Sequence, residues 1–194
     1  MDSRAIEMKE AYKAVFKSKI TRPGADALLE WLETKSDFFT APASTRYHGS
    51  YEGGLCEHSL NVYERLKNLC ENESGSSVTW ETIAIVSLLH DICKTNYYKQ
   101  EMRNVKENGA WVQKPYYTVE DTLPYGHGEK SVYIVSSFIK LTRSEAMAIR
   151  WHMGGFDESV KGGSYYISDA WRKYPLGMLL HCADLQATYI DEEE

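Results

Sequence analysis

The most constraining feature of the sequence is an apolar segment over residues 80–93 that closes on an adjacent histidine and aspartate. The segment reads WETIAIVSLLHDIC, and its apolar residues show no period that would separate an inward face from an outward face. We therefore expect a helix over this range that is buried on most sides. Burying the neighbouring side chains of His90 and Asp91 costs several kcal/mol unless a partner compensates.

Two explanations fit this pair. The histidine can lie at a helix C-terminus, stabilised by the helix dipole, with the aspartate beginning a turn. Alternatively, both can bind a divalent metal, because imidazole nitrogen and carboxylate oxygen suit manganese, iron, cobalt, nickel or zinc. Two other predicted helices also turn a ligand-type side chain inward, namely His58 in residues 55–71 and Asp184 in residues 176–189. Three helices that present such side chains favour the metal site.

Helical spacing dominates the rest of the chain, with one exception. Residues 97–119 are rich in strand-favouring side chains around Asn108-Gly109, a pair typical of hairpin turns. Thr142 and Glu145 form a capping box that predicts the start of a helix. We expect a mostly α fold with a small inserted β-hairpin, further helices near residues 25–33, 128–140 and 144–152, and loops over residues 37–54 and 154–164.

The composition is that of a globular protein. The 194 residues are 43% hydrophobic, which excludes a disordered chain and suits one domain with its own core. The net charge of −6 disfavours a long nucleic acid as ligand. The four cysteines are scattered, so we expect reduced thiols rather than a disulfide framework or a structural zinc site. No apolar run reaches the ~18 residues of a membrane span and no signal peptide precedes the helices, so we expect a cytoplasmic protein. Residues 191–194 are acidic, and we expect them to form a solvated tail.

The histidines and aspartates follow the order of a known family. His58, then His90-Asp91, then Asp184 resembles the H…HD…D signature of the HD-domain metal-dependent phosphohydrolase superfamily. The surrounding residues agree, as in GGLCEHSL at 53–60, LLHDICK at 88–94 and ADL at 183–185. The resemblance covers about residues 45–190 and implies a single HD-domain helical bundle, with residues 1–44 as an N-terminal helical extension. It also implies one or two divalent transition-metal ions, bound in the first instance by His58, His90, Asp91 and Asp184.

Further histidines lie between these motifs. His127 and His152 resemble the extra ligands of family members with two metals, in which Asp91 would bridge the ions; alternatively, they contact substrate phosphate or line the pocket. His48 has a placement that resembles HD modules of bacterial exoribonucleases and relaxase-associated proteins, and we interpret it as a pocket group that contacts substrate. His181 is interpreted as a structural residue or a hydrogen-bond partner of the site.

Phosphate binding also needs cations. Lys94 follows the HD pair by one turn, where family members often place a phosphate-contacting lysine, and Lys130 and Arg150 lie near the later histidines. The alternative interpretation is that each of these three residues is a solvated charge on the surface. Glu57 and Glu129 neighbour ligand positions and are candidate hydrogen-bond partners of the ligand imidazoles.

These residues lead to one main functional hypothesis. We expect a hydrolase of the EC 3.1 class that acts on a small phosphorylated substrate, most plausibly a nucleotide or deoxynucleotide, by attack of metal-bound hydroxide on phosphorus. The candidate catalytic residues are Asp91, His127 and Lys94. Aromatic residues of the hairpin, Trp111 among them, either cover the pocket and stack on a base or simply pack the hairpin. The alternatives are an HD-fold di-iron oxygenase and a non-catalytic nucleotide-sensing module. Each of these functions is compatible with a homo-oligomer.

Overall fold

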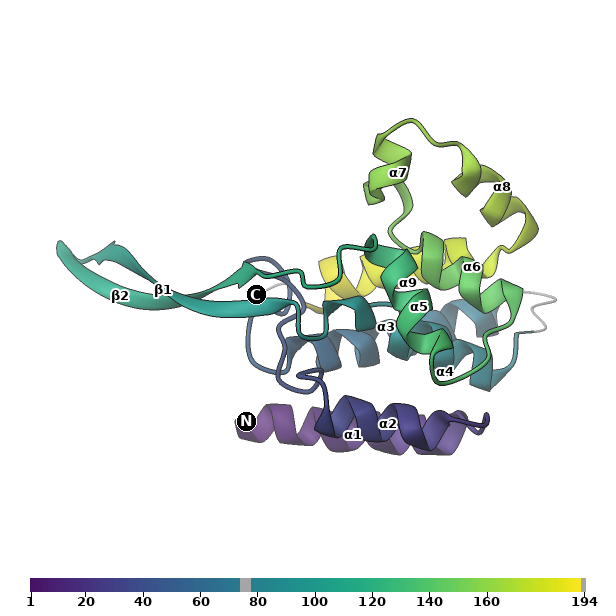
Figure 1. The fold of residues 1–194 in the computed structure, drawn as a ribbon, viewed down its shortest axis with the longest axis horizontal. Coiled ribbons are helices and arrows are strands. Elements are labelled where there is room, and N and C mark those ends of the chain that lie inside the picture. Colours follow the sequence, from purple (N-terminus) through teal and green to yellow (C-terminus); the bar gives the residue numbers. More distant parts are fainter. Residues whose placement is uncertain (74–77, 193–194) are drawn as a thin grey trace.

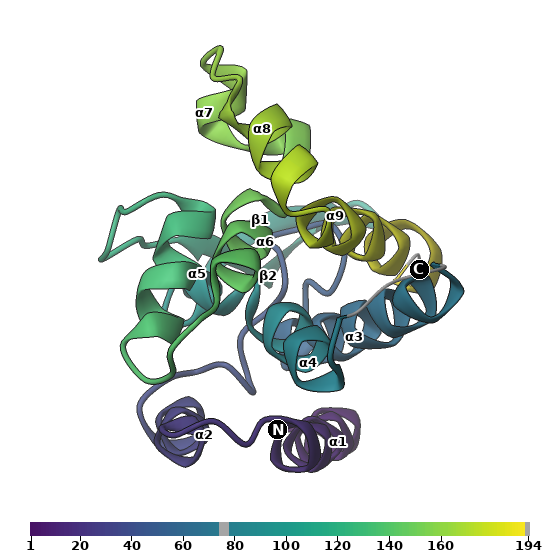
Figure 2. The same cartoon turned by 90° about the vertical axis from the view of Figure 1, so that its right-hand side faces the viewer.

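The computed structural model describes residues 1–73 and 78–192, and its fold is mostly helical with one two-stranded antiparallel sheet. Helices α3 and α4 form the centre, with α1 and α2 side by side below them and α5, α6 and α9 above (Figures 1 and 2). The elements of this body are α1 (Ser3–Lys19), α2 (Ala25–Thr34), α3 (Gly54–Asn72), α4 (Trp80–Leu89), α5 (His127–Ser136), α6 (Arg143–Trp151) and α9 (Leu176–Gln186). The shorter ones are η1 (Ile92–Lys94), η2 (Gly154–Phe156), α7 (Glu158–Lys161), α8 (Tyr166–Lys173) and the π-helical turn η3 (Ala187–Asp191).

Helix α4 is exposed only in its first turn, which agrees with the predicted burial on most sides. Every residue from Ile83 to Leu89 is buried, which explains why no polar face interrupts the sequence. The helix ends earlier than residue 93, because the backbone of Asp91 leaves the α-helical region at φ −103° and ψ 15°. The tighter η1 turn follows, with the Lys94 amide donating to the Asp91 carbonyl at 2.9 Å. Ile92 and Cys93 remain buried in that turn, so the apolar pattern conceals the break.

The N-terminal helices share the core of the remaining chain. Tyr12 of α1 is fully buried, and its hydroxyl donates to the carbonyl oxygen of Leu88 in α4 at 3.0 Å. Arg22, just before α2, forms two hydrogen bonds of 2.6 Å to the buried carboxylate of Glu145 in α6. Glu145 also accepts from Thr82 of α4 at 2.7 Å, so one carboxylate joins three parts of the bundle.

The predicted hairpin is present and projects away from the helices (Figure 1). Its strands, β1 (Tyr98–Glu107) and β2 (Ala110–Val119), pair antiparallel around a turn at Asn108-Gly109. Trp111 lies near that turn and is 71% exposed, far along the projecting arm. The expectation that Trp111 covers the pocket is therefore wrong, because a long two-stranded ribbon carries it away from the body.

Several element boundaries differ from those expected. The predicted helix over residues 128–140 ends at Ser136, where the amides of Ser137 and Phe138 bond the carbonyls three residues back and tighten the last turn, while the apolar pattern continues. The predicted loop over residues 154–164 contains η2 and α7, the latter capped by the Asp157 carboxylate. The capping box of Thr142 and Glu145 is confirmed at the start of α6. None of the described helices is long and apolar enough to cross a membrane.

Candidate metal centre

The four residues of the H…HD…D pattern meet at one point between α3, the end of α4 and α9. His58 Nε2 lies 3.2 Å from Asp184 Oδ1 and 3.7 Å from Asp91 Oδ2, and His90 Nε2 lies 3.6 Å from the same Asp91 oxygen. His58, His90 and Asp91 are all buried. The sequence places these residues on three separate elements, and the packing of α4 against α3 brings them together.

Three imidazole nitrogens at this point make no hydrogen bond. Among the described residues, the Nε2 atoms of His58, His90 and His152 are buried and lack an aligned hydrogen-bond partner. The opposite nitrogens are anchored: His90 Nδ1 donates to the Ser87 carbonyl and His152 Nδ1 to the Ile149 carbonyl, each at 2.7 Å. Anchoring one ring nitrogen leaves the other with its lone pair directed inward, which is how histidines that bind metals are held. The donor set therefore fits a divalent metal ion.

The ring of His58 is anchored by a residue that the sequence analysis assigned to a solvated tail. His58 Nδ1 lies 3.1 Å from both carboxylate oxygens of Glu192, and the Asn61 amide donates to Glu192 at 2.9 Å. Arg65, one further turn along the same face of α3, pairs with Asp191. The expectation of a solvated tail is wrong for Asp191 and Glu192, because the side chains of both residues are bound by residues of α3. Positions 193 and 194 lie outside the described residues.

Both glutamates proposed as imidazole partners have other partners instead. Glu57 pairs with Arg4 and accepts a hydrogen bond from the Tyr51 hydroxyl at 3.0 Å. Although Glu57 precedes His58 in the sequence, its side chain points away from the imidazole ring. Glu129 pairs with Arg150. Both expectations are corrected by the helical geometry, in which consecutive side chains point in different directions.

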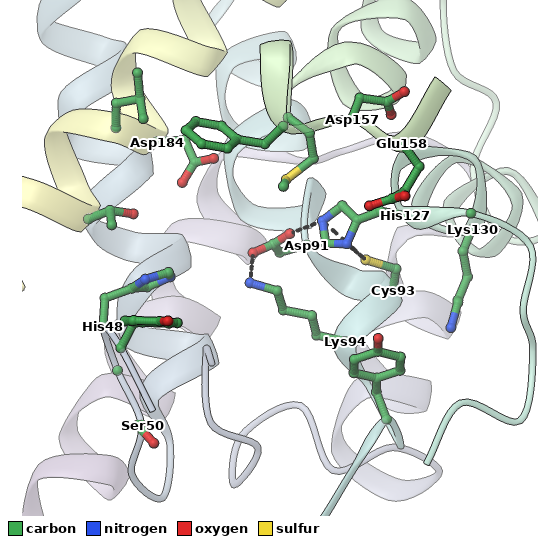
Figure 3. A pocket seen from close by; sticks show the side chains of 18 of the residues that line it. His48, Ser50, Asp91, Cys93, Lys94, His127, Lys130, Asp157, Glu158 and Asp184 are labelled. Atoms are coloured by element: carbon green, nitrogen blue, oxygen red, sulfur yellow. Dashed lines mark hydrogen bonds and ion pairs between the residues drawn. The ribbon is translucent and has the colours of Figure 1, made fainter. Parts of the chain in front are cut away.

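His127 and His152 face the other oxygen of Asp91. His127 Nε2 donates to Asp91 Oδ1 at 2.8 Å (Figure 3). His152 Nε2 lies 3.4 Å from the same oxygen. Their ring centroids are 5.1 Å apart. Helices α5 and α6 approach closely here, since a Cβ atom at Gly128 would lie 2.2 Å from the Arg150 carbonyl oxygen. The two oxygens of Asp91 thus face two different pairs of histidines.

Cys93 is a member of the site that the sequence analysis did not single out. Its thiol lies 3.5 Å from Nδ1 and 3.6 Å from Nε2 of His127, as the dashed contacts in Figure 3 show. Asp91, Cys93 and His127 each offer a ligand-type atom within 4.8 Å of the others. All four cysteines are free. The signal available in the sequence was the position of the thiol, two residues after Asp91.

The electrostatics of the cluster reflect its close charges. Burial lowers the pKa of His58, but the neighbouring carboxylates of Asp184 and Glu192 raise it overall to about 10. Burial likewise opposes the charged form of His127, whereas Cys93 and Asp91 raise its pKa to about 10. Burial lowers the pKa of His90 to about 4, so that ring is neutral and available as a ligand at pH 7.

The candidate cations are held in three different ways. Lys94 Nζ lies 2.7 Å from Asp91 Oδ2, and its side chain reaches the cavity from the η1 turn (Figure 3). Lys130 also lines the cavity but pairs with Asp121 and lies over the Tyr97 ring. Arg150 pairs with Glu129 and Asp157 and is not among the residues that line the cavity.

The remaining two histidines support the cluster from opposite sides. His48 lines the cavity with its ring centroid 5.0 Å from that of His58, and its Nε2 atom is buried without a hydrogen-bond partner. The loop that carries it is held to α3, since a Cβ atom at Gly54 would lie 2.0 Å from the Gly49 carbonyl oxygen. His181 Nδ1 donates to the carbonyl of His152 at 2.6 Å, which agrees with its predicted supporting role.

A cavity of about 1400 Å³ opens directly beside the cluster. Asp91 and Asp184 lie at its wall together with His48 and His127, as Figure 3 shows. Aromatic and cationic side chains also line the cavity, namely Arg46, Tyr47, Lys94, Tyr97, Lys130, Phe156, Lys161 and Tyr189. Carboxylates outside the cluster line it too, namely Asp121, Glu129, Asp157, Glu158 and Glu192. A concave site that combines aromatic side chains with converging polar groups is typical of small-molecule binding.

Comparison with known proteins agrees with this arrangement. The family model of the HD domain matches residues 55–188, which include all four residues of the H…HD…D pattern. The chain belongs to the HD-domain family. A stretch of 87 residues of this HD protein is also 36% identical to a dihydroneopterin 2',3'-cyclic phosphate phosphodiesterase from Methanocaldococcus jannaschii. The stretch covers 43% of this chain and 32% of the relative, so the chain spans about a third of that protein's length. No solved structure matches the chain.

Proposed function

We propose that this HD protein is a metal-dependent phosphohydrolase that cleaves a small phosphorylated substrate, a nucleotide or deoxynucleotide, in the cavity beside Asp91. One observation carries the proposal: the buried Nε2 atoms of His58, His90 and His152 have no hydrogen-bond partner and lie around one carboxylate. Buried nitrogens without partners are costly in a folded protein. A divalent ion is the partner that their chemistry fits.

The metal ligands proposed are His58, His90, Asp91 and Asp184 for one ion, and His127 and His152 with Asp91 for a second. Asp91 can serve both ions, because its Oδ2 atom faces His58 and His90 while its Oδ1 atom faces His127 and His152. Imidazole and carboxylate donors favour manganese, iron, cobalt, nickel or zinc. Such ions lower the pKa of a water molecule and polarise the phosphoryl group.

Lys94 is proposed to hold the substrate phosphate. Its ammonium group has three donors, and the contact with Asp91 Oδ2 at 2.7 Å uses one of them. The side chain is only 14% exposed, so charge-assisted hydrogen bonds from its remaining donors are shielded from water. His48 lies across the cavity from Lys94 and is proposed as a second polar contact to the substrate (Figure 3). Lys130 pairs with Asp121 and Arg150 pairs with Asp157. Both carboxylates line the cavity, so these ion pairs hold parts of its wall in place.

The relative from Methanocaldococcus jannaschii adds a substrate class to test. Its name describes the opening of a 2',3'-cyclic phosphodiester on a compound with a fused heterocycle. The cavity of this chain offers aromatic side chains for a heterocycle and Lys94 for a phosphodiester. We therefore include cyclic phosphodiesters of nucleotides and of dihydroneopterin among the candidate substrates.

The experiment is a product screen with the purified protein. Nucleoside mono- and triphosphates, their deoxy forms and 2',3'-cyclic esters are incubated with manganese, cobalt, nickel, zinc or magnesium, and products are separated by chromatography. We expect hydrolysis of a phosphate ester that needs a transition metal and is abolished in His90→Ala. Cleavage of no phosphate ester with any of these metals would overturn the proposal.

The same screen separates this function from the HD-fold di-iron oxygenase. An oxygenase with these ligands would consume dioxygen in its iron-loaded form and would not need water as the attacking group. Oxygen uptake is therefore measured with the iron-loaded protein beside each hydrolysis assay. Uptake that depends on substrate, without phosphate-ester cleavage, would replace the hydrolase by the oxygenase.

A further inference from the structure

The thiol of Cys93 makes a weak hydrogen bond to the imidazole of His127. The thiol is buried at the cavity wall, on the η1 turn that also carries Asp91 and Lys94. Its amide is fixed by a 3.2 Å hydrogen bond to the Ser131 hydroxyl of α5. That bond ties the turn to the helix that begins at His127. The backbone therefore holds the sulfur atom beside the imidazole.

Three of these groups lie close enough for one ion to span them. Asp91, Cys93 and His127 each offer a ligand atom within 4.8 Å of the other two. Cys93 Sγ lies 3.6 Å from His127 Nε2, and atoms that surround a tetrahedral ion at bond lengths of about 2.0–2.3 Å stand roughly 3.3–3.6 Å apart. The 2.8 Å contact between Asp91 Oδ1 and His127 Nε2 is a hydrogen bond that an ion would replace. His152 Nε2 adjoins the same Asp91 oxygen at 3.4 Å.

A second observation points to the same position. His152 Nε2 is fully buried, has no hydrogen-bond partner and faces Asp91 Oδ1. Its Nδ1 atom is already used by the Ile149 carbonyl at 2.7 Å. The nitrogen therefore needs a partner beside the Asp91 oxygen that His127 also contacts.

We propose that Cys93 is a thiolate ligand of the second metal ion, together with Asp91, His127 and His152. This inference rests on the two-ion form of the proposed function. On binding, the S–H bond breaks, its proton leaves to solvent and the sulfur lone pair forms the bond to the metal; the metal keeps its oxidation state. Thiolate is a soft ligand, so this ion prefers zinc, iron or cobalt over manganese or magnesium. The first site, with only nitrogen and oxygen ligands, lacks that preference.

The test is a cobalt titration of the metal-free full chain, followed by absorption spectroscopy. A cysteine thiolate bound to cobalt gives sulfur-to-metal charge-transfer absorption in the near ultraviolet, whereas nitrogen and oxygen ligands do not. We expect two bound cobalt ions per chain, and this absorption to grow with only one of them. Cys93→Ser and Cys93→Ala remove the absorption and weaken that ion at least about tenfold, in line with losses seen when metal sites are perturbed.

Cys182→Ser is the matched control. Cys182 lies on α9 outside the cavity wall and its thiol contacts Met178, so its replacement leaves spectrum and stoichiometry unchanged. Circular dichroism of each metal-free variant checks that the fold is intact. Two bound cobalt ions without the near-ultraviolet absorption would overturn the role of Cys93 and leave the proposed function standing. A single bound ion would overturn the two-ion form and the role of Cys93 with it, whereas a hydrolase with one ion would still be judged by the product screen.

Discussion

The two oxygens of Asp91 face surroundings of different character. On the Oδ2 side, His58 and His90 are buried, and their outer nitrogens are fixed by Glu192 and the Ser87 carbonyl. On the Oδ1 side, the His127 side chain is 29% exposed, and its Nδ1 atom lies 3.5 Å from the Cys93 thiol rather than beside a second carboxylate. The comparison teaches that the two oxygens of one aspartate face a closed pair of histidines backed by Glu192 and a pair that opens to the cavity. The predictions below test whether the two sides behave independently.

Loss of Asp91 should have the largest effect, because this residue belongs to both sides. We expect Asp91→Ala to lower kcat/KM by more than about 10³-fold, since removing one group that stabilises developing charge typically costs 10²–10³-fold alone. Metal analysis after dialysis should show neither ion retained at stoichiometric level. A variant that kept both ions would show that the histidines hold them without the carboxylate.

Replacement of Lys94 should weaken the interaction with substrate and leave metal binding unchanged. We expect Lys94→Ala to lower kcat/KM by about 10- to 150-fold, because a charge-assisted hydrogen bond contributes roughly 1.5–3 kcal/mol. Its metal content should equal that of the parent chain. Lys99→Ala, on the exposed start of the hairpin, is the matched control and should change kcat/KM by less than about twofold. Loss of metal from Lys94→Ala would contradict this division of roles.

Replacement of Glu192 should weaken metal binding only on the Oδ2 side of Asp91. We expect Glu192→Ala to weaken one ion by about 10- to 100-fold, the usual cost of removing a hydrogen-bond partner from a metal-binding histidine. Glu192→Gln keeps an acceptor for His58 and should lose less affinity. Asp191→Asn breaks only the pair with Arg65 and serves as the control. If both ions weakened equally, the two sides would be coupled rather than independent.

The smallest effect concerns the stability of the metal-free protein. The folded-state pKa of His58 is raised to about 10 from an ordinary value of about 6.5, so protonated His58 stabilises the fold. That contribution is complete below pH ~6.5 and is lost as the pH rises toward 10. Urea unfolding should therefore show a free energy that falls across this window. His58→Gln should flatten the fall, and an unchanged slope in this variant would assign the effect to other groups.

The parts of the structure that were predictable are those with a local signal. The capping box of Thr142 and Glu145 and the Asn108-Gly109 turn involve neighbouring residues, so the sequence alone suffices for them. The apolar pattern predicted the burial of α4, but could not reveal that the helix ends at Leu89, because buried residues continue on both sides of the break. The four residues of the H…HD…D pattern stood out as ligand-type side chains on apolar helix faces, the family resemblance supported the choice, and the structure brings them together at one point.

The missed members of the site depend on distant contacts. Glu192 looks like any residue of an acidic tail until the face of α3 that carries His58, Asn61 and Arg65 is packed against it. The partners of Glu57 and Glu129 were wrong for the converse reason, since neighbours in sequence were taken as neighbours in space. Packing, rather than residue type, decides these cases.

Gly128 has a consequence for the dimensions of the site. Because no side chain separates α5 from α6 at this point, the distance between His127 and His152 is set by contact of one backbone with another. Any residue with a Cβ atom would force the helices apart and enlarge the gap between the two imidazoles, although both histidines would still be present. Transplanting the ligands alone onto another helical bundle would therefore not reproduce the centre; the glycine at the crossing would have to be transferred with them.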